Sequence, residues 1–389
     1  MKHSTSSSPP LNETRKIDSL TSTRFLAAIL VVLYHRGLEL MLRESPVAGR
    51  LVRIGFVSVG FFYSLSGFVL ALAYANRKRD DLKFYISRLA RIYPLYALAL
   101  LLALPGFLLK WNHGSVKSAE GWAALVTAPF LLQAWIPSTA LAWNGPGWSL
   151  SCETLFYLIF PFVLPWALQL SLRNLWFCLA GSWVAAMLPP IMVHFFMGWQ
   201  PVSVHIPDHW RFWADLVSYN PIARAPEFLA GILAGCILLR REKFDSRLGT
   251  WLIAAGVAIG GVAMLAVSHI PVLLLHNGVL LPVWLFVIAG FTMQGFPGRL
   301  FSFRPFVFLG EISYGIYILQ SPVSGYFSIL LRPWLNHREF IDQYDSFGLL
   351  LLYVAVLTAV AALTFVYYEK PVGRFINRAW KRRELTTSS

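Results

Sequence analysis

Two ionisable side chains in the first apolar segment, Arg24 and His35, are eleven residues apart. On a helix this spacing is about three turns, so both side chains would share one face, roughly 16 Å apart along the axis. Imidazole exchanges protons near neutral pH, and a histidine in such a segment is therefore a candidate general base. The alternative is a histidine that only hydrogen-bonds a neighbouring helix.

A second candidate group lies in segment 148–170, where Glu153 is the only charged residue. Tyr157 follows Glu153 by one helical turn, on the same face. A lone carboxylate in an apolar segment either takes part in chemistry or pairs with an arginine for structural reasons. The segment by itself leaves both alternatives open.

Arg88 and Arg91 begin the third apolar segment and, at a spacing of three residues, would project from one side of a helix. Guanidinium groups bind phosphate oxygens through paired hydrogen bonds, so this pair is a candidate phosphate site. The alternative is that the two arginines only anchor the helix at the cytoplasmic surface, where Lys and Arg concentrate.

The composition indicates which elements position these residues. The chain is 57% apolar and only 13% charged, whereas soluble domains carry about 25% charged residues. Because a lipid-exposed backbone must satisfy its own hydrogen bonds, we expect an all-α polytopic membrane protein with about ten transmembrane helices of roughly 20 residues. The expected spans are 22–42, 54–75, 88–109, 148–170, 174–196, 225–240, 249–268, 271–294, 305–331 and 346–368.

Segment 121–135 is apolar but short, and counting it as a span would turn the basic blocks that follow it outward. We therefore expect a re-entrant or interfacial helix there. Both termini are then expected on the cytoplasmic side of a bacterial inner membrane, because most Lys and Arg residues face the cytoplasm in that arrangement. Residues 1–16 are predicted to be a disordered cytoplasmic tail, 17–378 the transmembrane domain, and 379–389 a basic cytoplasmic tail.

The net charge of +14 does not indicate nucleic-acid binding, because the basic residues stand in short blocks between apolar runs. Cys152, Cys178 and Cys236 lie within apolar segments and form no CxxC pair, which argues against disulfides and thiolate metal sites. No ligand cluster of recognisable spacing surrounds His35, so no metal is expected.

Six motifs follow one another along the chain: Arg24 with His35, Phe62–Phe68 (FYSLSGF), Arg88–Pro94 (RLARIYP), Trp148–Glu153 (WSLSCE), Arg224–Gly231 (RAPEFLAG) and Gly310–Tyr317 (GEISYGIY). In this order and spacing the chain resembles the membrane-bound acyltransferase 3 family over about 17–378. The resemblance implies a ten-helix domain that O-acylates carbohydrates and related acceptors. Two positions depart from the family pattern, since Thr154 stands where a second acidic residue is common and Gln320 where a histidine is common.

The resemblance also implies roles for residues. His35 matches the essential first-helix histidine, Arg24 its basic partner, and Glu153 the carboxylate of the Trp-Ser-Leu motif. Arg88 and Arg91 match the arginine pair of the third helix.

We accordingly expect an inner-membrane O-acyltransferase that takes an acyl group, with acetyl favoured, from cytoplasmic acyl-CoA. The acceptor would be a hydroxyl of a carbohydrate or lipid-linked glycan, such as an exopolysaccharide or lipopolysaccharide unit. Arg88, Arg91 and Arg24 would hold the donor phosphates, and no bound cofactor is needed. His35 would either deprotonate the acceptor or carry the acyl group transiently, with Glu153 orienting it.

Further hydrogen bonds near the reacting carbonyl are expected from Ser64, Ser66 and Tyr157. The loop from 198 to 224 contains Trp210 and Trp213, which would stack on sugar rings from the periplasmic side. The alternative for these tryptophans is an interfacial aromatic belt. A proton-coupled transporter is the competing function, although such carriers usually have two related halves and the Arg24–His35 pair has no counterpart in the second half.

Overall fold

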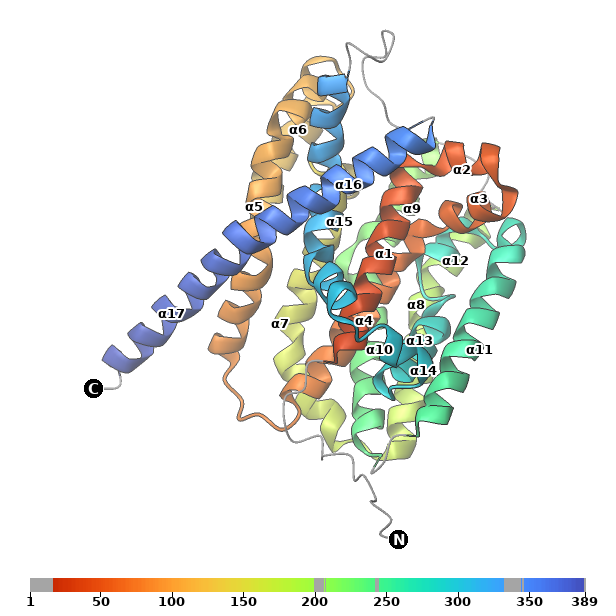
Figure 1. The fold of residues 1–389 in the computed structure, drawn as a ribbon, viewed down its shortest axis with the longest axis vertical. Coiled ribbons are helices and arrows are strands. Elements are labelled where there is room, and N and C mark those ends of the chain that lie inside the picture. The colour runs from red at the N-terminus through yellow and green to blue at the C-terminus, as the bar shows by residue number, and fades with distance from the viewer. Residues whose placement is uncertain are drawn as a thin grey trace.

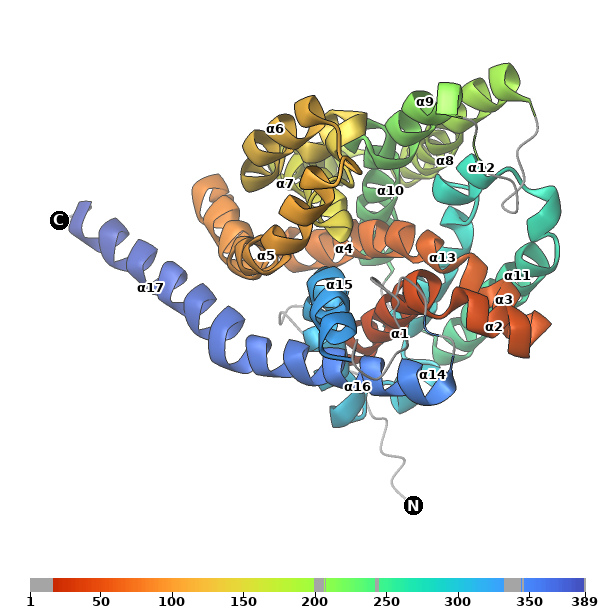
Figure 2. The ribbon, with the colours of Figure 1, turned by 90° about the horizontal axis from the view of Figure 1, so that it is seen from above.

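The computed structural model describes residues 17–198, 206, 208–241, 245–331, 344 and 346–387, and its regular elements there are helices (Figures 1 and 2). The expected tail 1–16 lies outside these residues. The long helices are α1 (Asp18–Arg36), α4 (Ser58–Tyr74), α5 (Asp81–Asn112), α7 (Trp148–Gln169), α8 (Leu172–Met197), α10 (Pro221–Leu239), α11 (Ser246–Leu265), α13 (Leu281–Thr292), α15 (Arg304–Leu331) and α16 (Phe347–Thr364). The other helices are α2 (Leu38–Glu44), α3 (Pro46–Arg53), α6 (Ser118–Thr127), α9 (Asp208–Tyr219), α12 (Val272–His276), α14 (Phe296–Leu300) and α17 (Lys370–Thr387).

The protein is an all-α polytopic membrane protein. Within the described ranges, eight helical stretches are long and apolar enough to cross a membrane, or nine if the bent pair α1 and α2 forms one span. Successive long helices run in alternating directions along the bundle (Figure 1). The ninth expected range, 305–331, forms α15, which is 28 residues long but is not one of those eight or nine.

The first expected span, 22–42, ends earlier than predicted. The helix stops at Arg36, and the chain turns by 85° at Gly37 into α2. Glycine makes such a departure from helical geometry inexpensive. The backbone N–H of Tyr344 then donates to the Arg36 carbonyl at 2.8 Å, which satisfies one group at the helix end. His35 therefore lies in the last turn of α1.

Segment 121–135 does not cross the bundle. It contains most of α6, a ten-residue helix about 15 Å long, followed by short 3₁₀ turns at 128–130 and 133–135. Two more 3₁₀ turns precede α7, which begins directly after Gly147. The expected re-entrant or interfacial character agrees with this short, irregular path.

Close helix packing around the centre depends on glycine. A Cβ at Gly67 of α4 would lie 2.2 Å from the Phe228 carbonyl, and one at Gly231 of α10 would lie 2.1 Å from the Ser64 carbonyl. A Cβ at Gly310 of α15 would meet the Thr21 carbonyl of α1 at 1.9 Å. In lipid, where the hydrophobic effect does not drive helices together, such close backbone approach is a main source of association. These contacts hold α4 against α10 and α15 against α1, and three of these helices line the site described below.

The expected span 271–294 is broken in the structure. The helix α12 ends at His276, and α13 begins at Leu281. Side chains of α10 form hydrogen bonds with the polar groups that the break leaves without helical partners. The Arg224 guanidinium donates to the His276 carbonyl and, at 2.7 Å, to Asn277 Oδ1. The Gly278 N–H donates to Glu227 Oε1 at 3.2 Å, so an ion pair from α10 replaces the missing helical bonds.

The last helix does not end where the expected span ends. A π-helical turn, Phe365–Glu369, joins α16 directly to α17, so the helical path continues through the expected tail to Thr387. Such turns insert one residue and occur frequently at functional sites. Here the turn brings Glu369, whose side chain is only 3% exposed, against Arg91 of α5.

Candidate functional site

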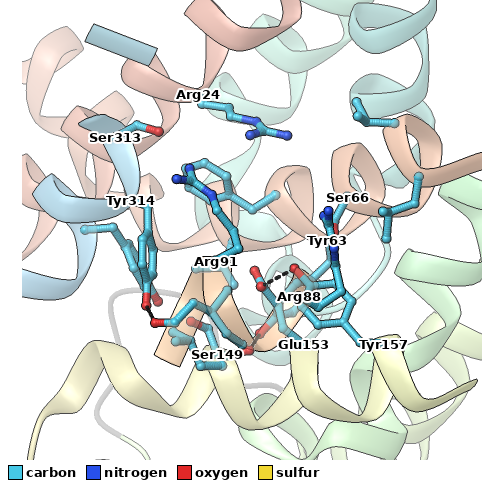
Figure 3. Close-up of a pocket in the computed structure, with 17 residues that line it drawn as sticks. Arg24, Tyr63, Ser66, Arg88, Arg91, Ser149, Glu153, Tyr157, Ser313 and Tyr314 are labelled. Carbon is cyan, nitrogen blue, oxygen red and sulfur yellow. Dashed lines mark hydrogen bonds between the residues drawn. The ribbon is translucent and has the colours of Figure 1, made fainter. Parts of the chain in front are cut away.

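A cavity of about 140 Å³ lies where α1, α4, α5, α7 and α15 meet (Figure 3). Its polar lining combines three arginines, one carboxylate, three serines and several tyrosines: Arg24, Arg88, Arg91, Glu153, Ser66, Ser149, Ser313, Tyr63, Tyr157, Tyr314 and Tyr317. Apolar side chains complete the wall, among them Val59, Phe62 and Ile92. The residues come from segments almost 300 positions apart, which only the folded bundle brings together.

Arg24 projects from α1 into the upper part of the cavity as drawn in Figure 3. No hydrogen bond or ion pair joins its guanidinium to the described part of the chain. A cation held inside a membrane protein without a carboxylate partner carries a large desolvation cost. Such a group is poised to bind an anion.

Arg88 and Arg91 enter the cavity from α5, three residues apart as expected, and point toward the same space as Arg24 (Figure 3). The guanidinium of Arg91 forms an ion pair with Glu369 from the π-helical turn. Arg88 stacks over the Phe84 ring, with 5.8 Å between its guanidinium carbon and the ring centroid. One of the three cations is thus fixed by a buried carboxylate, and two are left for an anionic ligand.

Glu153 and Tyr157 form the opposite wall. The Tyr157 hydroxyl donates to Glu153 Oε2 at 2.7 Å, and both side chains come from the same face of α7. Among the described residues of the lining, Glu153 is the only carboxylate, and it faces three arginines. The expectation that Glu153 orients His35 does not fit this geometry, because Glu153 lies at the level of Arg24.

His35 is not part of the cavity lining. It lies eleven residues beyond Arg24 on α1, about 16 Å along the axis. There its ring meets the Tyr34 ring edge-on, with 4.9 Å between centroids. The structure therefore separates the expected phosphate site from the expected base by about half the hydrocarbon thickness of a bilayer.

The serines of α4 are divided between two environments. Ser66 lines the cavity, whereas Ser64 is buried toward α10 and donates to the Gly60 carbonyl at 2.9 Å. Residues two apart on a helix point about 200° away from each other, so the two serines could not share one site. The predicted grouping of Ser64 with Ser66 is corrected accordingly.

The two tryptophans expected to bind the acceptor belong to α9 and do not line the cavity. Trp213 is 48% exposed, and Trp210 packs in a small apolar cluster with Met197, Ala214 and Leu273. Of the loop that contains them, 199–205 and 207 lie outside the described residues. In the described part of the chain, no three His, Cys, Asp or Glu side chains are grouped as metal ligands.

A profile of the acyltransferase 3 family, described as an acyltransferase domain, matches residues 17–369. The chain belongs to this family. It is therefore a membrane acyltransferase, and the transporter alternative is dropped. All five helices that line the cavity fall within the matched range, and so does Glu369 at its last position.

The chain is also similar to several individual proteins of known name. The chain is 28% identical to acyltransferase MdmB of Streptomyces mycarofaciens, covering 96% of this chain and 95% of that one. It is 25% identical to exopolysaccharide production protein ExoZ of Rhizobium meliloti (strain 1021), covering 72% and 80% of the two chains. It is 25% identical to the peptidoglycan O-acetyltransferase OatA of Listeria monocytogenes, covering 93% of this chain but 57% of that longer one. No solved structure matches the chain significantly.

Glu369, the carboxylate partner of the cavity residue Arg91, is the main residue that sequence reasoning missed in this acyltransferase. It directly follows an apolar run without charged residues, 346–368, and precedes Lys370. The rule that singled out Glu153, a lone carboxylate in a membrane segment, would also have found Glu369. Tyr314 belongs to a motif already noted, and its hydroxyl donates to the Ile92 carbonyl at 2.7 Å, tying α15 to α5 beside Arg91.

Proposed function

We propose that the protein is an O-acyltransferase that moves an acyl group from cytoplasmic acyl-CoA to a hydroxyl of a carbohydrate acceptor. The observation that carries this proposal is the convergence of Arg24, Arg88 and Arg91 on one cavity with a single carboxylate on its lining. Acyl-CoA brings several phosphate charges, and guanidinium groups bind phosphate through paired, charge-assisted hydrogen bonds. A cavity of about 140 Å³ fits part of this donor, so the remainder would extend outside it.

The distribution of the basic residues supports the proposed orientation. The connections after α4, α7 and α10 meet at one end of the bundle (Figure 1). They and the adjoining helix ends carry much of the positive charge, including Arg77, Lys78, Arg79, Arg173, Arg240 and Arg241. This asymmetry supports a cytoplasmic position for that end, since Lys and Arg concentrate on the cytoplasmic side of an inner membrane. The arginines of the cavity lie nearer to that end of their helices than His35 does.

In this proposal the phosphates stay near the arginines while the pantetheine arm extends along α1 toward His35. The His35 imidazole takes the proton of the acceptor hydroxyl, and the oxygen attacks the thioester carbon. The carbon–sulfur bond breaks, and the CoA thiolate leaves and takes up a proton. Glu153 holds Tyr157 and balances the charge of the arginines, in place of the orienting role toward His35.

The carbohydrate acceptor is proposed from two relatives. One is named for exopolysaccharide production and another for peptidoglycan O-acetylation, so both names point to glycans. The second name also favours acetyl as the group transferred. Trp213 stands exposed on α9, where it would offer a stacking face to a sugar ring.

The decisive assay incubates membranes with labelled acetyl-CoA and a panel of glycan acceptors and measures acceptor-dependent release of CoA. His35→Ala should lower the rate by about 10²- to 10⁴-fold, the usual loss for a general base. Arg173→Gln, which removes an exposed arginine at the same end of the bundle, should leave the rate unchanged. Wild-type transfer by His35→Ala at equal protein level would overturn the role of His35, and absence of CoA release with every acceptor would overturn the donor.

A rapid-quench experiment without acceptor separates the two roles of His35. Label bound to the protein, and lost in His35→Gln, would indicate an acyl-histidine intermediate. Absence of bound label together with full activity would indicate a general base.

A further inference from the structure

Five of the six basic residues of α17 lie on one side of the helix. Four of them follow the i, i+4 spacing and the fifth lies between them, so all five fall within about a third of the helix circumference. We name this set the basic stripe: Lys370, Arg374, Arg378, Lys381 and Arg382. All five residues are exposed. None of Arg374, Arg378 and Lys381 has a carboxylate partner within the described residues.

The opposite side of α17 is apolar and is only partly used by the bundle. It consists of Val372, Phe375, Ile376, Ala379 and Trp380. A Cβ at Gly373 would lie 3.0 Å from the Ala90 carbonyl, so the first turns of α17 rest closely on α5. Phe375 nevertheless remains 72% exposed, which is a large apolar area for a ring with no helix over it. The helix is thus amphipathic, with one charged side and one apolar side.

The position of α17 restricts what can cover it. The helical stretch Phe347–Arg382 has 36 residues and is about 54 Å long, whereas the hydrocarbon core is about 30 Å thick. The chain therefore leaves the hydrocarbon within this stretch, and α17 emerges at the membrane surface. Figures 1 and 2 both show α17 projecting sideways from the bundle, beyond α5.

We propose that α17 lies in the membrane interface, with the basic stripe bound to the phosphate groups of anionic phospholipids. Phe375 then inserts at the boundary between headgroups and acyl chains. Helices with Lys and Arg on one face and aromatic residues on the other bind in this plane, and their affinity depends on anionic lipid. An acidic protein would match the charge of the basic stripe but would leave Phe375 in water. The membrane boundary offers both lipid phosphates for the basic stripe and acyl chains for Phe375.

The test places a fluorescent bimane on Ala379→Cys in the full-length protein carrying Cys178→Ala; Cys152 and Cys236 are buried and do not label. The protein is reconstituted in nanodiscs of phosphatidylcholine alone or of phosphatidylcholine rich in phosphatidylglycerol. With phosphatidylglycerol we expect quenching by doxyl-labelled lipid, protection from aqueous iodide, and loss of both in molar salt. In phosphatidylcholine alone the label should be accessible to iodide.

The charge variant is Arg374→Gln, Arg378→Gln and Lys381→Gln together. Each basic residue near an anionic surface contributes about 1 kcal/mol, or about fivefold, so the loss of three should lower the interfacial population on the order of 100-fold. The matched control, Arg374→Lys with Arg378→Lys, keeps the charge and should behave as wild type. Iodide access in both lipid mixtures would overturn the proposal and favour a protein partner. Lipid insertion that is independent of phosphatidylglycerol and of these charges would also overturn it.

Discussion

The bundle contains two groups of arginine and glutamate that differ in how fully their charges are met. In the first, Arg224 and Glu227 of α10 form an ion pair at 2.9 Å, and their side chains are only 1% and 3% exposed. The Arg224 guanidinium also lies over the rings of Tyr63 and Trp148 and bonds the broken segment between α12 and α13. In the second, the cavity, three arginines face a single carboxylate on the lining, and among the residues that the structure describes only Arg91 has an ion-pair partner.

The difference teaches how to separate structural from functional charge in a membrane interior. Both groups cost desolvation energy, but the first recovers it from the protein itself. The second recovers it only when a ligand supplies the missing negative charge. Residues of the first group should therefore control stability, and residues of the second should control activity at little or no expense of stability.

The largest effect is expected when the satisfied pair is broken. Arg224→Met leaves the Glu227 carboxylate buried without its partner and the His276 carbonyl without its donor, which should destabilise the fold by about 3–5 kcal/mol. Thermal unfolding of the purified protein in detergent, followed by size-exclusion chromatography, measures this loss. In the double variant Arg224→Met with Glu227→Leu the loss should be smaller than the sum of the single losses, because the two residues are coupled. An additive double variant would contradict the pairing.

The opposite pattern is expected at Arg24. Arg24→Gln should lower acyl transfer by about 10- to 100-fold, the range for one charge-assisted contact to the donor. The melting temperature should stay equal or rise, because an uncompensated charge has been removed. The measurement pairs the CoA-release assay with thermal unfolding of the same preparation. A parallel fall of both quantities would place Arg24 in the structural class with Arg224.

A smaller effect on activity is expected for Arg91 and Glu369, because this cavity arginine also has a buried carboxylate partner, as Arg224 does. Glu369→Gln should raise the KM for acyl-CoA about tenfold with little change in kcat, since Arg91 loses the group that fixes it. Arg91→Lys should do the same, because lysine keeps the charge but not the planar fork. The double variant Arg91→Lys with Glu369→Gln should be no worse than either single change. Independent, multiplying effects on KM would show that Glu369 does not act through Arg91.

The smallest effects come from the two serines of α4, which form a matched pair. Ser66→Ala should reduce transfer a few-fold, as one neutral hydrogen bond is lost at the cavity. Ser64→Ala should lower stability by about 1 kcal/mol and leave the KM values for donor and acceptor unchanged. Steady-state kinetics of both variants, together with their melting temperatures, test this assignment. Equal kinetic effects of the two changes would contradict it.

Hydropathy and charge were sufficient to predict the helical class and the short path of 121–135, because a lipid-exposed backbone leaves few alternatives. Periodicity also placed Glu153 and Tyr157, and Arg88 and Arg91, on common faces. It could not find the break after His276, because that break depends on Arg224 and Glu227 from another helix. It could not find the π-helical turn either, since an inserted residue changes the phase of a helix without changing its composition.

That π-helical turn joins α16 and α17 into one continuous helical path beside the cavity. Glu369 is the last residue of the turn, and the next residue, Lys370, already belongs to the basic stripe. One residue more or less in the turn would rotate α17 by about 100° relative to α16, taking Gly373 away from Ala90 and Glu369 away from Arg91 together. The phase of this turn therefore sets two things at once, the Arg91–Glu369 ion pair beside the cavity and the side of α17 that packs on α5.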